Sequence, residues 1–193
     1  MSRRTIRSMV VAVAALVMVA GCAPAPSTGT SSPPTSPVWI VGDSLSQNVA
    51  ADITPAPYVG GVGGAGFVNH YYVNEGTILQ NTQNLIAQYG VPQRILVVGG
   101  VSDHGVPVTQ TVAAMAATGS ALSATGARVT WITQPKWSDY ATELAALNTW
   151  IRTQSDVIDC AATVESPFYD SGDHIHPTPA GYALYGACIT AHL

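Results

Sequence analysis

Short apolar segments that alternate with helical segments constrain the fold of this 193-residue chain more than any other feature. Val38–Val41, Arg94–Val98 and Arg128–Ile132 are brief β-branched runs bounded by turn residues, and Val157–Ala161 is a weaker fourth run. Such runs are typical of strands that are buried on both faces. Their alternation with helices predicts an α/β fold with a central, mostly parallel sheet covered on both sides.

The segments between these strands have helical periodicity. Hydrophobic positions three and four residues apart occur within residues 78–89, 112–122 and 140–151. Thr178–His192 predicts a final helix that tolerates a proline in its first turn. The sequence contains no internal repeat, and its length favours one folded domain.

The N-terminus predicts an export signal. Three arginines precede an apolar run, residues 9–20, which is too short to span a bilayer and ends in small residues. This order indicates a secretory signal peptide over residues 1–21. Its end resembles a bacterial lipobox, which implies lipid attachment to Cys22. An ordinary signal peptide with an incidental cysteine is the alternative.

Composition separates the rest of the chain into two parts and limits its partners. Residues 22–37 are rich in proline, serine and threonine and predict a flexible tether, and residues 38–193 form the expected domain. Removal of the signal leaves four of the seven basic residues against eleven acidic ones, a net charge of about −7. This charge argues against nucleic-acid partners. We expect a monomer in the cell envelope, held to the membrane by its lipid.

A candidate nucleophile follows the first strand. The stretch Val38–Ser46 ends in glycine, a carboxylate and two hydroxyls, and open α/β sheets bind ligands beyond the carboxyl ends of their strands. Ser44 needs a base, and a group that orients the base, to act as a nucleophile. Asp173 and His176, three residues apart near the C-terminus, supply both. Each residue alone reads as a helix cap or turn, whereas the set predicts a catalytic triad.

These two segments resemble a known family. Gly42-Asp43-Ser44-Leu45-Ser46 resembles the first block of the SGNH (GDSL) esterases and lipases, and Asp173-His174-Ile175-His176-Pro177-Thr178 resembles their last block. The resemblance covers residues 38–193. It implies a flavodoxin-like three-layer α/β/α sandwich, neither metal nor organic cofactor, and hydrolysis of small-molecule or glycan esters through an acyl-enzyme on Ser44. His176 is then the general base and Asp173 orients it.

The resemblance also implies an oxyanion hole. In the family this hole combines the amide of the nucleophile, here Ser44, a glycine amide from the second block and an asparagine side chain from the third. Gly61–Gly66 is the candidate second block, with Gly64 as the expected donor and Gly63 as its nearest competitor. Ser102 stands where the family pattern Gly-x-Asn-Asp has asparagine. Because a hydroxyl is shorter than a carboxamide, the chain is either an esterase with an altered hole or a degenerate surface lipoprotein that binds an acyl or glycan ligand.

Cysteine and histidine residues outside the motifs carry further expectations. Cys160 and Cys188 remain once Cys22 is assigned, and export to an oxidising compartment predicts that they pair. Two buried thiols are the alternative. His70 and His104 either line a substrate cleft or are solvated loop residues.

Two competing motifs carry less weight. Gly61–Gly66 matches the dinucleotide pattern Gly-x-Gly-x-x-Gly, but no clear strand precedes it and no acid follows about 20 residues later. The acids and histidines of residues 170–176 could form a metal cluster. A single short segment followed by proline gives poor geometry for such a site.

Overall fold

The computed structural model describes residues 34–69, 76–135, 140–164 and 172–193. The chain divides into two units, residues 1–32 and residues 33–193, and all described residues belong to the second. The predicted signal peptide, Cys22 and most of the tether therefore lie outside the described residues. Within the described part, no helix is both long enough and apolar enough to cross a membrane.

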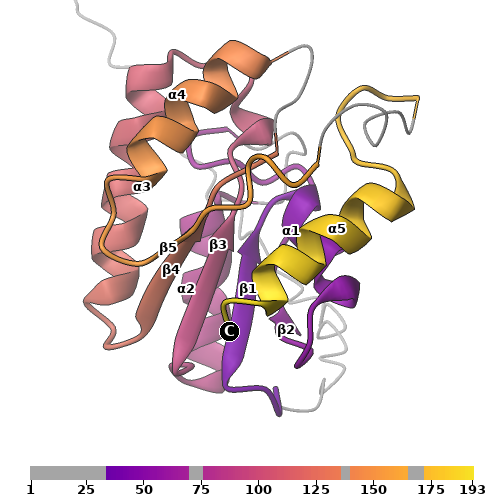
Figure 1. Ribbon diagram of the computed structural model, residues 1–193. Helices are drawn as coiled ribbons and strands as arrows, with labels where there is room; N and C mark the ends of the chain where they lie inside the picture. The colour runs from indigo at the N-terminus through magenta and orange to yellow at the C-terminus, as the bar shows by residue number, and fades with distance from the viewer. Residues whose placement is uncertain (1–33, 70–75, 136–139, 165–171) are drawn as a thin grey trace, which may run out of the picture. The chain divides into compact units, whose positions relative to one another are not determined.

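Five strands form one parallel sheet in the order β2-β1-β3-β4-β5 (Figure 1). The strands are β1 (Val38–Gly42), β2 (Tyr58–Val59), β3 (Arg94–Val98), β4 (Arg128–Ile132) and β5 (Val157–Ile158). This is the strand order of flavodoxin-like folds, and the predicted α/β class is confirmed.

Helices cover both faces of the sheet. They are α1 (Ser44–Val49), α2 (Ile78–Tyr89), α3 (Val108–Ser123), α4 (Ala141–Ile151) and α5 (Pro179–Thr190), with short 3₁₀ turns at η1 (Ala50–Asp52) and η2 (Val101–Asp103). Contacts join α1 to α5 on one face, whereas α2, α3 and α4 follow one another on the other face (Figure 1). The arrangement is a three-layer α/β/α sandwich.

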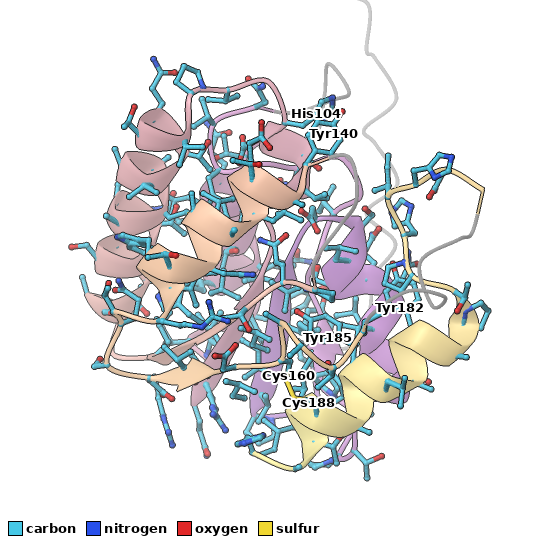
Figure 2. All side chains as sticks on the ribbon, turned by 45° about the horizontal axis from the view of Figure 1, so that its top comes forward. His104, Tyr140, Cys160, Tyr182, Tyr185 and Cys188 are labelled. Carbon is cyan, nitrogen blue, oxygen red and sulfur yellow. A yellow bond between two sulfur atoms is a disulfide. The ribbon has the colours of Figure 1, made fainter. Side chains whose placement is uncertain are left out.

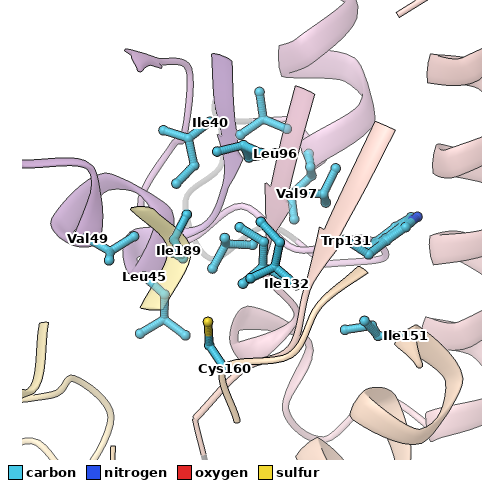
Figure 3. Close-up of a cluster of buried hydrophobic side chains, with 14 of the residues drawn as sticks. Ile40, Leu45, Val49, Leu96, Val97, Trp131, Ile132, Ile151, Cys160 and Ile189 are labelled. Atoms are coloured by element: carbon cyan, nitrogen blue, oxygen red, sulfur yellow. The ribbon is translucent and has the colours of Figure 1, made fainter. Parts of the chain in front are cut away.

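The central strands are buried because both of their faces carry apolar side chains. Ile40, Leu96 and Ile132 on β1, β3 and β4 are fully buried. Figure 3 shows side chains of this core on both sides of the strands, with Ile189 of α5 on one side and Ile151 of α4 on the other. This continuous core fixes the helices that carry the site.

The structure corrects the predicted elements at two strands. β5 ends at Ile158 rather than Ala161, because the amides of Cys160 and Ala161 donate to the Thr133 hydroxyl instead of continuing the ladder, at 2.8 and 2.9 Å. No pattern in the sequence predicted β2, which is only two residues long. The last helix is shorter than predicted and begins after its cap, Thr178.

Candidate active site

The strand order places Gly42–Ser46 and the segment that carries Ser102 at the same edge of the sheet. The chain leaves β1 toward α1 on one face and leaves β3 toward α3 on the other, and ligands bind at such a switch point. Gly42 and Val98 are register partners at the ends of β1 and β3. Ser44 therefore begins α1 close to the loop that carries Ser102.

The three predicted triad residues lie within contact distance of one another. Nε2 of His176 lies 2.7 Å from Oγ of Ser44, and Nδ1 of His176 lies 2.6 Å from Oδ2 of Asp173. The other carboxylate oxygen of Asp173 accepts hydrogen bonds from the amides of Ile175 and His176, both at 2.9 Å. Two backbone amides of this loop thus hold the Asp173 carboxylate in place, and the carboxylate in turn orients the imidazole ring of His176. This geometry suits proton transfer from the hydroxyl to the imidazole.

Helix α5 is attached to the rest of the domain along its length, and this attachment positions the preceding loop with His176. Asn48 of α1 donates to the hydroxyl of Tyr182 at 3.2 Å, and the hydroxyl of Tyr185 donates to the carbonyl that follows β4 at 3.0 Å. Burial raises the pKa of Tyr182, which keeps its phenol neutral. Cys188 forms a disulfide with Cys160, as expected from the sequence, with Cα atoms 6.0 Å apart (Figure 2).

A cavity of about 290 Å³ opens on Ser44 and His176. Its wall includes Gly63, Gly64 and Ser102. Among the described residues, the amides of Ser44, Gly63 and Gly64 have no acceptor, and the hydroxyl of Ser102 has no partner. The candidate oxyanion donors therefore surround the same space as the candidate nucleophile.

The glycine donors belong to a tight turn. The amide of Ala65 donates to the carbonyl of Val62 at 3.1 Å, and Gly64 has φ of +82°, a conformation that glycine adopts without strain. The turn places both central glycines, Gly63 and Gly64, on the cavity wall. The predicted donor and its competitor thus both line the substrate space.

A buried carboxylate beside the nucleophile ties two loops together. Asp43 is fully buried and accepts hydrogen bonds from the amides of Leu45, Gly100 and Val101 at 3.0, 3.0 and 3.1 Å. Burial raises the pKa of Asp43 to about 6, although these three hydrogen bonds act in the opposite direction. The first motif therefore supports the third directly.

A second buried carboxylate supports the glycine segment. Asp103 accepts hydrogen bonds from the amides of Phe67, Val68 and Asn69 at 2.7, 2.9 and 2.8 Å. The loop that follows β3 thus holds the chain just beyond Gly64. The sequence interpretation did not assign these positioning roles to Asp43 or Asp103. Their place inside the motifs was the available signal, but an acid near a helix start usually reads as a cap.

The remaining predicted residues have mixed outcomes. His104 lines the cavity and lies beside Tyr140, with ring centroids 5.1 Å apart (Figure 2). His70 and Asp170 lie outside the described residues. Across the described ranges, no three acidic, histidine or cysteine side chains cluster as metal ligands would.

Comparisons with known proteins give a structural match without a sequence match. No family model and no curated protein matches the sequence. A lipolytic protein of the G-D-S-L family from Desulfitobacterium hafniense superposes with a TM-score of 0.66 and 15% identity, over 81% of this chain and 98% of the other. The chain has the SGNH hydrolase fold.

Two solved structures of esterases also match. A psychrotrophic esterase from Pseudoalteromonas gives a TM-score of 0.58 and 16% identity, over 80% of this chain and 94% of the other. A carbohydrate acetylesterase family member from Sinorhizobium meliloti gives a TM-score of 0.62 and 12% identity, over 80% and 96%. The resemblance inferred from the sequence motifs is confirmed for the fold.

Proposed function

We propose that this protein is a serine esterase that hydrolyses neutral carboxylic esters through an acyl-enzyme. The contact of Ser44 Oγ with His176 Nε2, at 2.7 Å, carries this proposal. In the first step, Ser44 Oγ attacks the ester carbonyl carbon while His176 accepts the hydroxyl proton. The intermediate then expels the alcohol, which takes that proton from His176. Water attacks the acyl-serine by the same route and releases the acid.

The charge that develops on the carbonyl oxygen needs donors placed in advance. The amide of Ser44, one glycine amide of the turn and the hydroxyl of Ser102 surround the cavity and are the proposed donors. Asp43 and Asp103 hold the loops that present them. Donors of this kind contribute about 10²- to 10³-fold each in turnover.

The cavity favours a small acyl group. Its volume of about 290 Å³ lies at the lower end of small-molecule sites, and Val101 and Ile175 give its wall an apolar character. Short acyl esters, including acetylated glycans, are the proposed substrates. The similarity to a carbohydrate acetylesterase fold supports this class.

The alternative is a degenerate pocket that binds an acyl or glycan ligand without turnover. The presence of Ser102 in the asparagine position favours this alternative. Hydrolysis of p-nitrophenyl acetate and butyrate by the mature protein and by Ser44→Ala separates the two. The esterase proposal expects a loss of at least about 10³-fold in the variant. Equal rates of hydrolysis for the two proteins would rule out the esterase proposal and favour the alternative, a pocket that binds its ligand without turnover.

We also propose export and lipid anchoring through Cys22. The basic start, the apolar run and the position of Cys22 support this placement. Expression of the full chain in a bacterial host should put it in the detergent phase of a Triton X-114 partition. Cys22→Ser should move it to the aqueous phase or leave an uncleaved precursor. A lipid-free mature form of the unmodified chain would contradict anchoring.

A further inference from the structure

A second cavity lies away from the candidate active site. It has a volume of about 390 Å³ and is bounded by α3, by β4 and by the chain from the end of α4 to Asp156. It shares no lining residue with the cavity at Ser44. The volume falls within the range of roughly 300–1,000 Å³ typical of small-molecule sites.

Two tryptophans form the aromatic part of this cavity. Trp131 of β4 and Trp150 of α4 meet edge to face, with ring centroids 5.1 Å apart and planes at 88°. Trp131 is only 4% exposed as a residue, but its indole N–H is not among the buried polar atoms that lack a partner, and it has no acceptor among the described residues, so it is open to solvent. A ligand acceptor at this edge would take the place of the water that such an accessible N–H binds.

The missing side chain of Gly119 leaves this indole edge uncovered. A Cβ at Gly119 would lie 3.0 Å from Cζ2 and 3.5 Å from Nε1 of Trp131. Gly119 lines the cavity, so the uncovered edge belongs to the cavity wall. Figure 3 shows the nitrogen end of Trp131 pointing away from the other labelled core side chains.

The rim of the cavity is polar and carries little free charge. Ser120 and Ser123 of α3 and Ser155 contribute hydroxyls, and Gln154 contributes a carboxamide. Of the described residues that line the cavity, Asp156 alone is charged, and it is bonded to Arg128 and Thr130. Burial raises the pKa of Asp156, but these hydrogen bonds and the nearby arginine charges outweigh burial and lower it. The site therefore offers no free cation to an anionic ligand.

We propose that this cavity binds a neutral sugar ring. The electron-rich indole of Trp150, which is half-buried, suits the C–H groups on one side of a pyranose. The hydroxyls, the carboxamide and the indole N–H suit the sugar hydroxyls around its edge. Binding here stands whether or not Ser44 hydrolyses esters. Only the consequence, retention of the enzyme on an acylated glycan, rests on the proposed function.

The test is an NMR titration of the ¹⁵N-labelled mature Ser44→Ala protein, which binds without turnover. Cellotetraose, xylotetraose and tri-N-acetylchitotriose are added separately to about 10 mM, which fills about 90% of a site with Kd near 1 mM. At least one of them should shift the Trp131 and Trp150 indole N–H signals saturably. The signals are assigned with Trp131→Phe and Trp150→Phe.

Two blocking variants test the location. Gly119→Leu fills the space against Trp131, and Ser120→Phe fills the exposed rim, so a folding defect in one does not remove the test. Each should weaken binding at least about 10-fold, whereas Ala117→Leu, on α3 but outside the cavity lining, should not. The absence of shifts with all three sugars would overturn the proposal. Unchanged binding in both blocking variants would overturn it equally.

Discussion

The carboxylate of Asp43, next to Ser44, accepts a hydrogen bond of 3.1 Å from the amide of Val101, next to Ser102. The buried carboxylate of Asp43 thus links the segment of Ser44 to the segment of Ser102, although it makes no hydrogen bond with either serine side chain. A neighbouring bond to the amide of Gly100 shares the same carboxylate oxygen. Stability and activity should therefore both depend on the charge of Asp43.

Asp43→Asn tests this link through the pH dependence of stability. The pKa of Asp43 is about 6 in the folded chain, above its usual unfolded value of about 3.9. The folded state therefore holds the proton more tightly, so this group stabilises the fold below about pH 4 and loses that contribution as pH rises through 6. Urea unfolding should show that the stability advantage of the unmodified protein over the variant shrinks by about 2 kcal/mol between about pH 4.5 and 7.5. A stability difference between the two proteins that stays constant over this pH range would contradict the link.

Ser102 tests whether the altered third motif still contributes a donor. Ser102→Ala should lower kcat on p-nitrophenyl acetate by up to about 10²-fold with little change in KM, because the donor acts on the developing oxyanion. Ser102→Asn should raise kcat, because a carboxamide reaches further into the cavity. A fall in Ser102→Asn would show that the pocket is built around the hydroxyl. Thr109→Ala removes an exposed hydroxyl on α3 that lines neither cavity, and it is the matched control.

Asp173→Asn tests the orientation of the base. The amide group would favour the wrong tautomer of His176, so that Nε2 could no longer accept the Ser44 proton. Loss of the corresponding carboxylate in a serine protease costs about 10⁴-fold. Because the Asp173 side chain is 46% exposed, we expect a smaller loss, on the order of 10³-fold in kcat. A loss below about tenfold would contradict the assigned role.

The Cys160–Cys188 disulfide closes a segment of 28 residues that contains His176. Its reduction should lower the free energy of unfolding by about 3–4 kcal/mol, mainly by releasing the unfolded chain. Urea unfolding with and without reductant measures the change, and the Cys160→Ala/Cys188→Ala variant should be insensitive to reductant. Thiol titration of the unfolded, unreduced mature protein should find neither cysteine free.

The sequence predicted the elements whose signal is local. Arg94–Val98 and Arg128–Ile132 are strands with the predicted bounds, because their apolar runs are continuous and end at turn residues. The buried face of α3 was less predictable. Val112 was expected inside, but Thr111 is more buried, because alanine-rich helices have a weak apolar stripe.

In the candidate site, too, the sequence predicted the residues that lie in local motifs but not those whose roles depend on distant contacts. The contacts among Ser44, Asp173 and His176 follow from motifs that lie at strand and helix ends. The positioning roles of Asp43 and Asp103 depend on the tertiary fold, because each accepts hydrogen bonds from amides 34 to 58 residues away in the sequence. Asp103 accepts from Phe67, and Asp43 accepts from Val101. Periodicity and spacing carry no information about such bonds.

The central claim is that Ser44 is the nucleophile, and covalent labelling tests it most directly. A fluorophosphonate reacts with an activated serine by forming an O–P bond with loss of fluoride. Intact-mass and peptide mass spectrometry should find one adduct per chain, on Ser44, with labelling slowed in His176→Ala. The absence of an adduct on the mature protein, or equal labelling of Ser44→Ala, would contradict the account.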